Sequence, residues 1–269
     1  NPFINGDRPY TFVEIFSQLA WGFGYCGMPH VLVRFMAVRS DKELKKSWVI
    51  AIIWDLLSLT AAFAIAVIGR AYLLPTILGV FIEMIRKVFT SQLALPFIGG
   101  LFLCGILAAI MSTADSQLLV TASAVSEDLY HNFIKKDADS KEILRVSRIT
   151  VIVIAIIAFA IDPNSSIMGL VSNAWAGLGA AFGPIVVMSL FWRRTNLQGA
   201  IAGMVTGGLT VIIWDYIPLV GGQTLGTYTG LYSLAVGFLL SLVVIVIVSL
   251  LTKAPSKEIT DEFDKVAAK

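Results

Sequence analysis

Charged side chains are scarce in this sequence: 14% of its 269 residues are Asp, Glu, Lys or Arg, whereas soluble domains contain about 25%. Histidine and cysteine are also rare, with His30, His131, Cys26 and Cys104 as the full set. They form no HExxH motif and no cysteine framework, which argues against an intramembrane metalloenzyme and a disulfide-stabilised domain. No nucleotide-binding loop, nucleic-acid-binding patch or soluble catalytic domain is evident. The chain begins at Asn1 without a methionine and without the basic segment that opens a signal peptide, so we expect a fragment that starts in a loop of a longer protein.

Hydrophobic residues make up 57% of the chain and gather in long runs. Because a membrane-spanning helix needs about 20 apolar residues, we predict an all-α membrane protein with seven transmembrane helices. The expected spans are residues 11–38, 48–68, 96–125, 143–161, 167–192, 197–213 and 231–251. A shorter amphipathic piece at 76–90 is expected to lie at the interface. Residues 1–252 would form the bundle, and residues 253–269 a charged cytoplasmic tail.

The loop charges predict an orientation. Sixteen of the twenty Lys and Arg residues fall on one side when the loops are assigned alternately, and Arg8, Arg70, Arg86 and Lys87 fall on the other. The positive-inside rule places the richer side in the cytoplasm. Seven spans then put Asn1 outside and the C-terminus inside.

The third expected span contains hydroxyl groups in an otherwise apolar run, GILAAIMSTADSQLLVTASA at 105–124. A helix turns about 100° per residue, so Ala109, Ser112, Thr113 and Ser116 share one face. Two hydroxyls and a carbonyl can supply the neutral oxygen ligands that a hard cation needs. The pattern is also typical of close helix packing with interhelical Ser and Thr hydrogen bonds, and the residues alone leave both interpretations open.

Two acids fall within expected spans, Asp115 beside the hydroxyl face and Asp55 in WDLLSLT. Intramembrane acids usually face a cavity or a partner and are candidates for gating or coupling. Asp115 can equally be an interfacial residue at a polar end of its span. Asp55 has the same two interpretations.

The first expected span contains WGFGYCGMPH, in which glycines and a proline interrupt an aromatic run. Glycine and proline weaken helices, and transporters use broken helices to line sites near mid-membrane. Trp21 and Tyr25 are four residues apart and share a face, which favours a wall for a small apolar ring. An interfacial aromatic belt with a proline kink is the alternative. The 167–192 span, with SNAWAGLGAAFGP, is also expected to be broken, so three spans could converge on one site.

Three stretches resemble the sodium:solute symporter family. They are WGFGYCGMPHVLVRFMA, LAAIMSTADSQLLVTASAVSEDLY and LVSNAWAGLGAAFGPIVVMSLFWRRTNLQGAIAGMVTGGLTVIIW, and the third is similar to the proline branch in particular. The resemblance extends from about Trp21 to Lys253. It implies the inverted-repeat helix bundle of the leucine transporter. The first five spans would be the second repeat, the last two would be peripheral C-terminal helices, and the first repeat would be missing from this chain.

The resemblance also implies roles for individual residues. The sodium ligands would be the Ala109 carbonyl, Ser112 and Thr113. The solute contacts would be Trp21, Tyr25, Pro29 and Ser116. Two positions depart from the proline branch, because Ser116 stands where cysteine is usual and Asp115 where serine is expected.

Together, these features predict a sodium-coupled secondary active transporter, not an enzyme, that imports L-proline across the cytoplasmic membrane by alternating access. Na⁺ would be the coupling ion. One alternative is a symporter of the same family for pantothenate, a sugar or a carboxylate. Others are a membrane sensor module, a passive channel and an intramembrane protease, for which no paired catalytic motif is evident.

Overall fold

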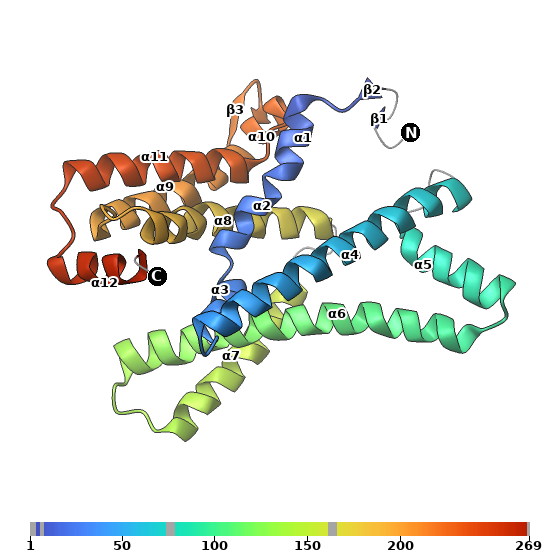
Figure 1. The fold of residues 1–269 in the computed structure, drawn as a ribbon, viewed down its shortest axis with the longest axis horizontal. Coiled ribbons are helices and arrows are strands. Elements are labelled where there is room, and N and C mark those ends of the chain that lie inside the picture. The colour runs from blue at the N-terminus through green and yellow to red at the C-terminus, as the bar shows by residue number, and fades with distance from the viewer. Residues whose placement is uncertain (1–3, 6–7, 74–78, 161–165, 268–269) are drawn as a thin grey trace. The chain divides into compact units, whose positions relative to one another are not determined.

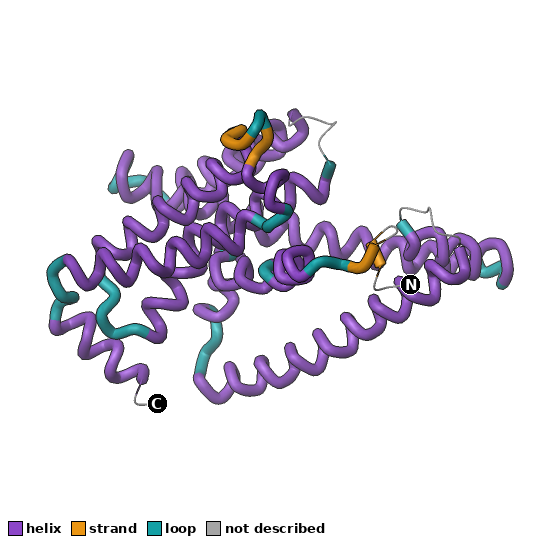
Figure 2. The backbone as a smooth tube through the Cα atoms, turned by 90° about the horizontal axis from the view of Figure 1, so that it is seen from above, coloured by secondary structure: helices purple, strands orange, loops and turns teal. Residues whose placement is uncertain are grey.

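The computed structural model describes residues 4–5, 8–73, 79–160 and 166–267, and these are mostly helical (Figure 2). In this part of the chain, six helices are long and apolar enough to cross a membrane. The chain divides into two compact units. Unit 1 takes Phe3–Arg34 and Asp162–Lys269, and unit 2 takes Phe35–Ile161.

Unit 1 begins with a broken helix (Figure 1). Two short antiparallel strands, β1 (Ile4–Asn5) and β2 (Arg8–Pro9), precede α1 (Phe12–Leu19), α2 (Trp21–Gly24), the 3-10 turn η1 (Tyr25–Gly27) and α3 (Pro29–Met36). A capping box between Thr11 and Glu14 starts α1, because both side chains satisfy backbone N–H groups that the first turn leaves free. Met28 is extended, with φ −82° and ψ 114°. The predicted break is therefore confirmed, and residues 11–38 contribute no single long helix.

Three long helices form the core of unit 1: α8 (Ile167–Phe191), α9 (Leu197–Tyr216) and α11 (Ser233–Leu251). They lie side by side (Figure 1). Side-chain oxygens of Ser166 and Asn196 cap α8 and α9 by accepting from backbone N–H groups three residues on, at 3.0 and 2.9 Å. The core contains Ala176, Ala180, Val211 and Leu234, each at most 3% exposed. Small residues at these contacts allow the helices to approach closely.

The predicted break in the 167–192 span is wrong, because α8 is continuous and contains Pro184 in its interior. Proline cannot donate to the carbonyl four residues earlier, which here belongs to Ala180. A Cβ on Gly207 of α9 would lie 2.0 Å from that Ala180 oxygen. The glycine packs directly on the carbonyl, and the small residues of α8 serve helix packing instead of a break.

The remaining elements of unit 1 lie at the two ends of α9 and α11. The antiparallel pair β3 (Pro218–Val220) and β4 (Gln223–Thr224) and the short helix α10 (Leu225–Thr229) connect α9 to α11. The expected tail contains α12 (Lys257–Ala267). Arg193 donates to both carboxylate oxygens of Asp264 in α12, at 2.7 and 2.8 Å. Both partners are more than half exposed, so solvent screens this ion pair and it contributes little to stability.

Unit 2 contains three long helices and an interrupted connection. Its elements are α4 (Asp41–Leu73), α5 (Val80–Ile85), the π-helix η2 (Arg86–Gln92), α6 (Pro96–Ser123), the π-helix η3 (Ala124–Ile134) and α7 (Ser140–Ala160). The helix expected at 48–68 is longer at both ends. The one expected at 96–125 continues through η3. The amphipathic piece expected at 76–90 corresponds to α5 and η2, with 76–78 outside the described residues.

The long helices of unit 2 bury little of their apolar surface within the described chain. In α4 and α7, none of the most apolar 18-residue window is buried, and in α6 the share is 6%. The corresponding share reaches 39% for α11 in unit 1. Unit 2 therefore presents broad apolar faces, as expected for helices that meet lipid or further helices.

Candidate functional site

The predicted sodium ligands lie together on α6. The Thr113 hydroxyl donates to the Ala109 carbonyl at 3.3 Å, and the Ser116 hydroxyl donates to the Ser112 carbonyl at 2.8 Å. Such bonds to the residue four positions earlier use the hydroxyl hydrogen and leave its oxygen lone pairs available. Ala109, Ser112 and Thr113 are exposed. Their oxygens thus form an accessible polar stripe on an otherwise apolar helix.

Asp115 and Asp55 occupy different helices of unit 2. Asp115 lies in α6 next to the stripe, Asp55 lies near the middle of α4, and both are exposed. Neither carboxylate forms a salt bridge with another described residue. The roles predicted for these acids in gating or coupling remain predictions.

The aromatic residues of the broken helix pack on α8 through Trp175. The Trp21 and Trp175 ring centroids are 6.0 Å apart, and Tyr25 meets Trp175 edge-on at 4.9 Å. The Trp175 indole Nε1–H donates to the Trp21 carbonyl at 3.0 Å. This bond satisfies a backbone carbonyl at the point where the helix is interrupted. Trp21 also stacks on Tyr232, with 5.5 Å between centroids. Trp21 is therefore packed between residues of unit 1.

Glycines allow the broken helix to approach α8. A Cβ on Gly24 would lie 2.0 Å from Trp175 Nε1, and one on Gly27 would lie 2.7 Å from both the Gly183 nitrogen and the Leu178 oxygen. A larger residue at either position would displace the backbone or the indole. The glycine run therefore positions Tyr25 against Trp175, and Tyr25 remains 58% exposed.

The structure brings together Trp21 and Tyr25 and places the four α6 candidates, Ala109, Ser112, Thr113 and Ser116, along one helix. Sequence reasoning missed Trp175 and Tyr232 as supports of Trp21. Trp175 stands in the small-residue run SNAWAGLG, where a single large aromatic ring is a signal for a specific contact. Tyr232 lies directly before the last long helix, and nothing in its local pattern marks it.

The long apolar helices are those of a membrane protein, and a broken helix is a feature that transporters use. The profile of the sodium:solute symporter family matches residues 6–207. The chain belongs to this family, whose members are transporters and not enzymes, and it is a multi-pass membrane protein.

Several curated proteins are similar to the chain in sequence. The osmoregulated proline transporter OpuE of Bacillus subtilis is 45% identical over 252 residues, which cover 92% of this chain and 50% of the relative. The sodium/proline symporter of Escherichia coli is 42% identical over 270 residues, covering 96% and 51%. The high-affinity proline transporter PutP of Bacillus subtilis is 42% identical over 262 residues, covering 94% and 53%.

The chain therefore spans about half the length of these relatives. No solved structure matches it.

Proposed function

We propose that this chain forms part of a sodium-coupled secondary active transporter that imports L-proline across the cytoplasmic membrane. Its family and the names of its relatives, a proline transporter and a sodium/proline symporter, support this proposal. By the same resemblance, the first five expected spans are the second repeat of a leucine-transporter-like bundle and the last two are peripheral. The first repeat would then belong to the rest of the protein.

The polar stripe on α6 is the observation that carries the proposal. If Ser112 and Thr113 served packing alone, we would expect their hydroxyls to bond to neighbouring helices. The Thr113 hydroxyl instead donates back to the Ala109 carbonyl of α6 itself. Accessible neutral oxygens in the middle of an apolar helix suit a monovalent cation that sheds its water. Ligands from the first repeat would complete the sodium shell.

The solute would bind beside the broken helix. By the family resemblance, Trp21 and Tyr25 would offer aromatic surface to the proline ring, Pro29 would add an apolar contact, and Ser116 would offer a hydroxyl. Sodium entering from outside would stabilise the outward-facing state and raise the affinity for proline, and by reciprocity proline would raise the affinity for sodium. Movement of one helix group against the other would then open both sites inward.

The test uses the complete gene product in vesicles, with proline uptake measured against sodium concentration. Ser112→Ala combined with Thr113→Ala removes two ligands, and we expect the half-saturating sodium concentration to rise about tenfold, which corresponds to ~1.4 kcal/mol. Thr121→Ala is the matched control, because Thr121 bonds back to Gln117 in the same helix at 2.8 Å and is also exposed. It should leave the sodium requirement unchanged.

An unchanged sodium requirement in the double variant would contradict the ion site. Uptake by the unmodified protein that does not depend on the sodium gradient would contradict the proposed coupling. Competition of labelled proline by pantothenate, sugars or carboxylates identifies the solute, since a stronger competitor than proline itself would assign the protein to another branch of the family.

A further inference from the structure

A polar cavity lies in unit 1, on the N-terminal side of Trp21. Its volume is about 400 Å³, and its walls come from α1, α2, α8, α9, α10 and the start of α11. Ser17 and Gln18 line it one turn before Trp21, whereas the predicted solute contacts Tyr25 and Pro29 follow Trp21 in the chain. Trp21 thus belongs to both places, and the cavity is distinct from the predicted solute site.

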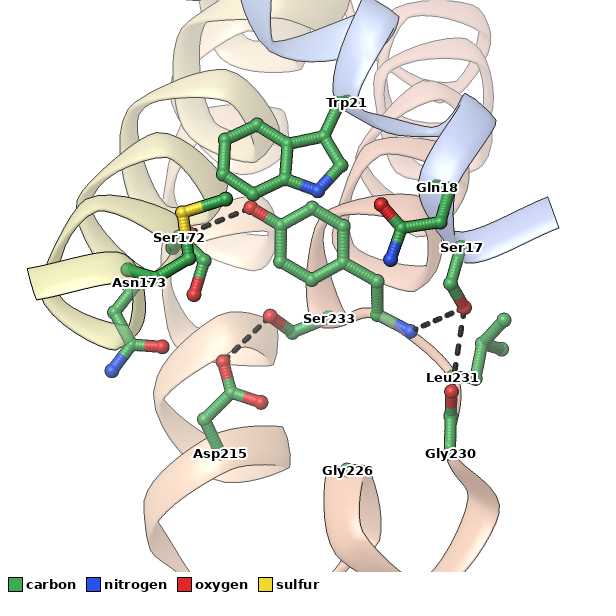
Figure 3. A pocket seen from close by; sticks show the side chains of 12 residues that line it. Ser17, Gln18, Trp21, Ser172, Asn173, Asp215, Gly226, Gly230, Leu231 and Ser233 are labelled. Carbon is green, nitrogen blue, oxygen red and sulfur yellow. Dashed lines mark hydrogen bonds between the residues drawn. The ribbon is translucent and has the colours of Figure 1, made fainter. Parts of the chain in front are cut away.

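One wall of this cavity is a fixed aromatic surface (Figure 3). Tyr232 stacks on Trp21, its hydroxyl donates to the Ser172 carbonyl at 2.7 Å, and its backbone N–H donates to the Ser17 hydroxyl at 3.0 Å. Each of these contacts holds Tyr232 in place. The two rings therefore form a preformed apolar face, which is the usual lining of a small-molecule site.

The opposite wall presents a carboxylate. Asp215 lies in the last turn of α9, and one of its oxygens accepts from the Ser233 hydroxyl at 2.6 Å. Among the described residues, no Lys, Arg or His forms an ion pair with it. A Cβ on Gly226 would lie 3.0 Å from the other oxygen, Oδ1, so glycine at this position keeps that side of the carboxylate open.

We propose that this cavity is an outer binding site for the amino-acid solute, with the ammonium group held by Asp215. This inference rests on the proposed function. The apolar body of the solute would lie against the rings of Trp21 and Tyr232, whose faces also attract cations. Gln18 is exposed, and its side chain makes no hydrogen bond to another described residue, so its amide N–H would donate to the solute carboxylate.

A bare metal ion fits the cavity less well. The described residues contain no group of three His, Cys, Asp or Glu side chains that could hold a metal. A single carboxylate and two aromatic rings in the lining of a cavity of about 400 Å³ match an organic ammonium with an apolar body. The site would collect solute before it passes Trp21, so it should affect the Michaelis constant more than the turnover rate.

The experiment measures initial rates of sodium-driven proline uptake by the complete gene product in proteoliposomes. Asp215→Asn should raise KM about fivefold and change kcat by less than about twofold. Asp261→Asn removes the same charge from the exposed face of α12 and should leave KM unchanged. Asp215→Glu keeps the charge and should stay near the wild-type value.

A second readout separates charge recognition from a structural role. Tetrahydrofuran-2-carboxylate has a ring oxygen in place of the ring nitrogen of proline and carries no ammonium. Its inhibition constant should be the same in wild type and in Asp215→Asn, whereas the affinity for proline falls. Equal weakening of both compounds would overturn the inference.

The remaining outcomes are also decisive. Wild-type uptake with an unchanged KM in Asp215→Asn would overturn the outer site and leave the proposed function intact. Wild-type protein that takes up no proline would overturn the proposed function, and the outer site with it. If Asp215→Asn does not fold, Gln18→Ala tests the same cavity, since an unchanged KM would overturn the inference and a rise of about threefold would support it.

Discussion

At the scale of single residues, Gly207 illustrates how the absence of a methyl group determines helix packing. Pro184 leaves the Ala180 carbonyl without its usual donor, and Gly207 packs on that oxygen so closely that a Cβ would lie 2.0 Å away. A backbone carbonyl inside a continuous helix cannot rotate aside. The contact between α8 and α9 therefore depends on glycine at this position.

We expect Gly207→Ala to destabilise the complete protein by about 1–3 kcal/mol, the usual cost of overpacking. Gly208→Ala is the control, because its Cβ would meet nothing closer than the Ala181 Cβ at 4.0 Å. Alanine favours helix over glycine by about 1 kcal/mol, so the control should be neutral or stabilising. Thermal unfolding in detergent measures both, and equal effects would contradict the packing argument.

Part of this packing could be predicted from the sequence. Gly199, Gly203 and Gly207 are four residues apart and share one helix face, which predicts close helix contacts. The pattern does not name the partner. Gly207 contacts α8 at Ala180, while Gly199 and Gly203 contact α11 at Ser249 and Ile245. One face of α9 therefore packs against two different helices. The stripe of Ala109, Ser112 and Thr113 was predictable for the same reason of periodicity.

At the scale of elements, the broken helix shows what local pattern can and cannot predict. Its glycines and Pro29 predicted the break, and the structure confirms it. Its anchor was not predictable, because the Trp175 indole that donates to the Trp21 carbonyl is 154 residues away in the sequence. The 167–192 span has a similar local composition, yet α8 is continuous. Its neighbours α9 and α11 pack against it, and no local signal in the span specifies these contacts.

The anchor of the broken helix can be tested with two neighbouring glycines. A Cβ on Gly24 would lie 2.0 Å from Trp175 Nε1, whereas one on Gly22 would meet nothing within 4 Å. We expect Gly24→Ala to displace the indole, to loosen the aromatic contacts of Trp21 and Tyr25, and to raise KM for proline about tenfold, as expected for the loss of an aromatic contact of ~1.4 kcal/mol.

Gly22→Ala should keep the wild-type KM, because its methyl group enters open space. Uptake kinetics of the complete gene product, corrected for the amount of protein in the membrane, provide the comparison. If both variants transport normally, the indole does not position the broken helix.

At the scale of the whole molecule, the two units differ in how much of the apolar surface of their long helices they bury. Unit 1 has a core between α8, α9 and α11, whereas unit 2 leaves the apolar windows of α4 and α7 entirely unburied within the described chain. Hydropathy alone identified nearly all of these helices, since length and composition suffice. Which faces meet depends on contacts between distant segments, and the pattern of a single helix does not specify them.

The loop charges and the structure agree on the ends of unit 1. Arg194 donates to the Thr252 carbonyl at 2.8 Å, and the Asn196 amide donates to the Lys253 carbonyl at 2.7 Å. The basic segments that follow α8 and α11 therefore lie at the same end. The connection between α9 and α11, residues 217–232, contains no Lys or Arg. By the positive-inside rule, we expect the basic end in the cytoplasm and the uncharged connection at the exterior.

This orientation predicts opposite accessibility for two engineered thiols. In a cysteine-free version of the complete protein, Gln223→Cys in β4 should react from outside intact cells with a membrane-impermeant maleimide, because that residue is exposed in the uncharged connection. Ser256→Cys, exposed next to α12, should react only after the membrane is permeabilised. The reverse pattern would invert the assignment. It would also place the Asp215 cavity, which α10 and the start of α11 line, on the cytoplasmic side, where it could not collect incoming solute.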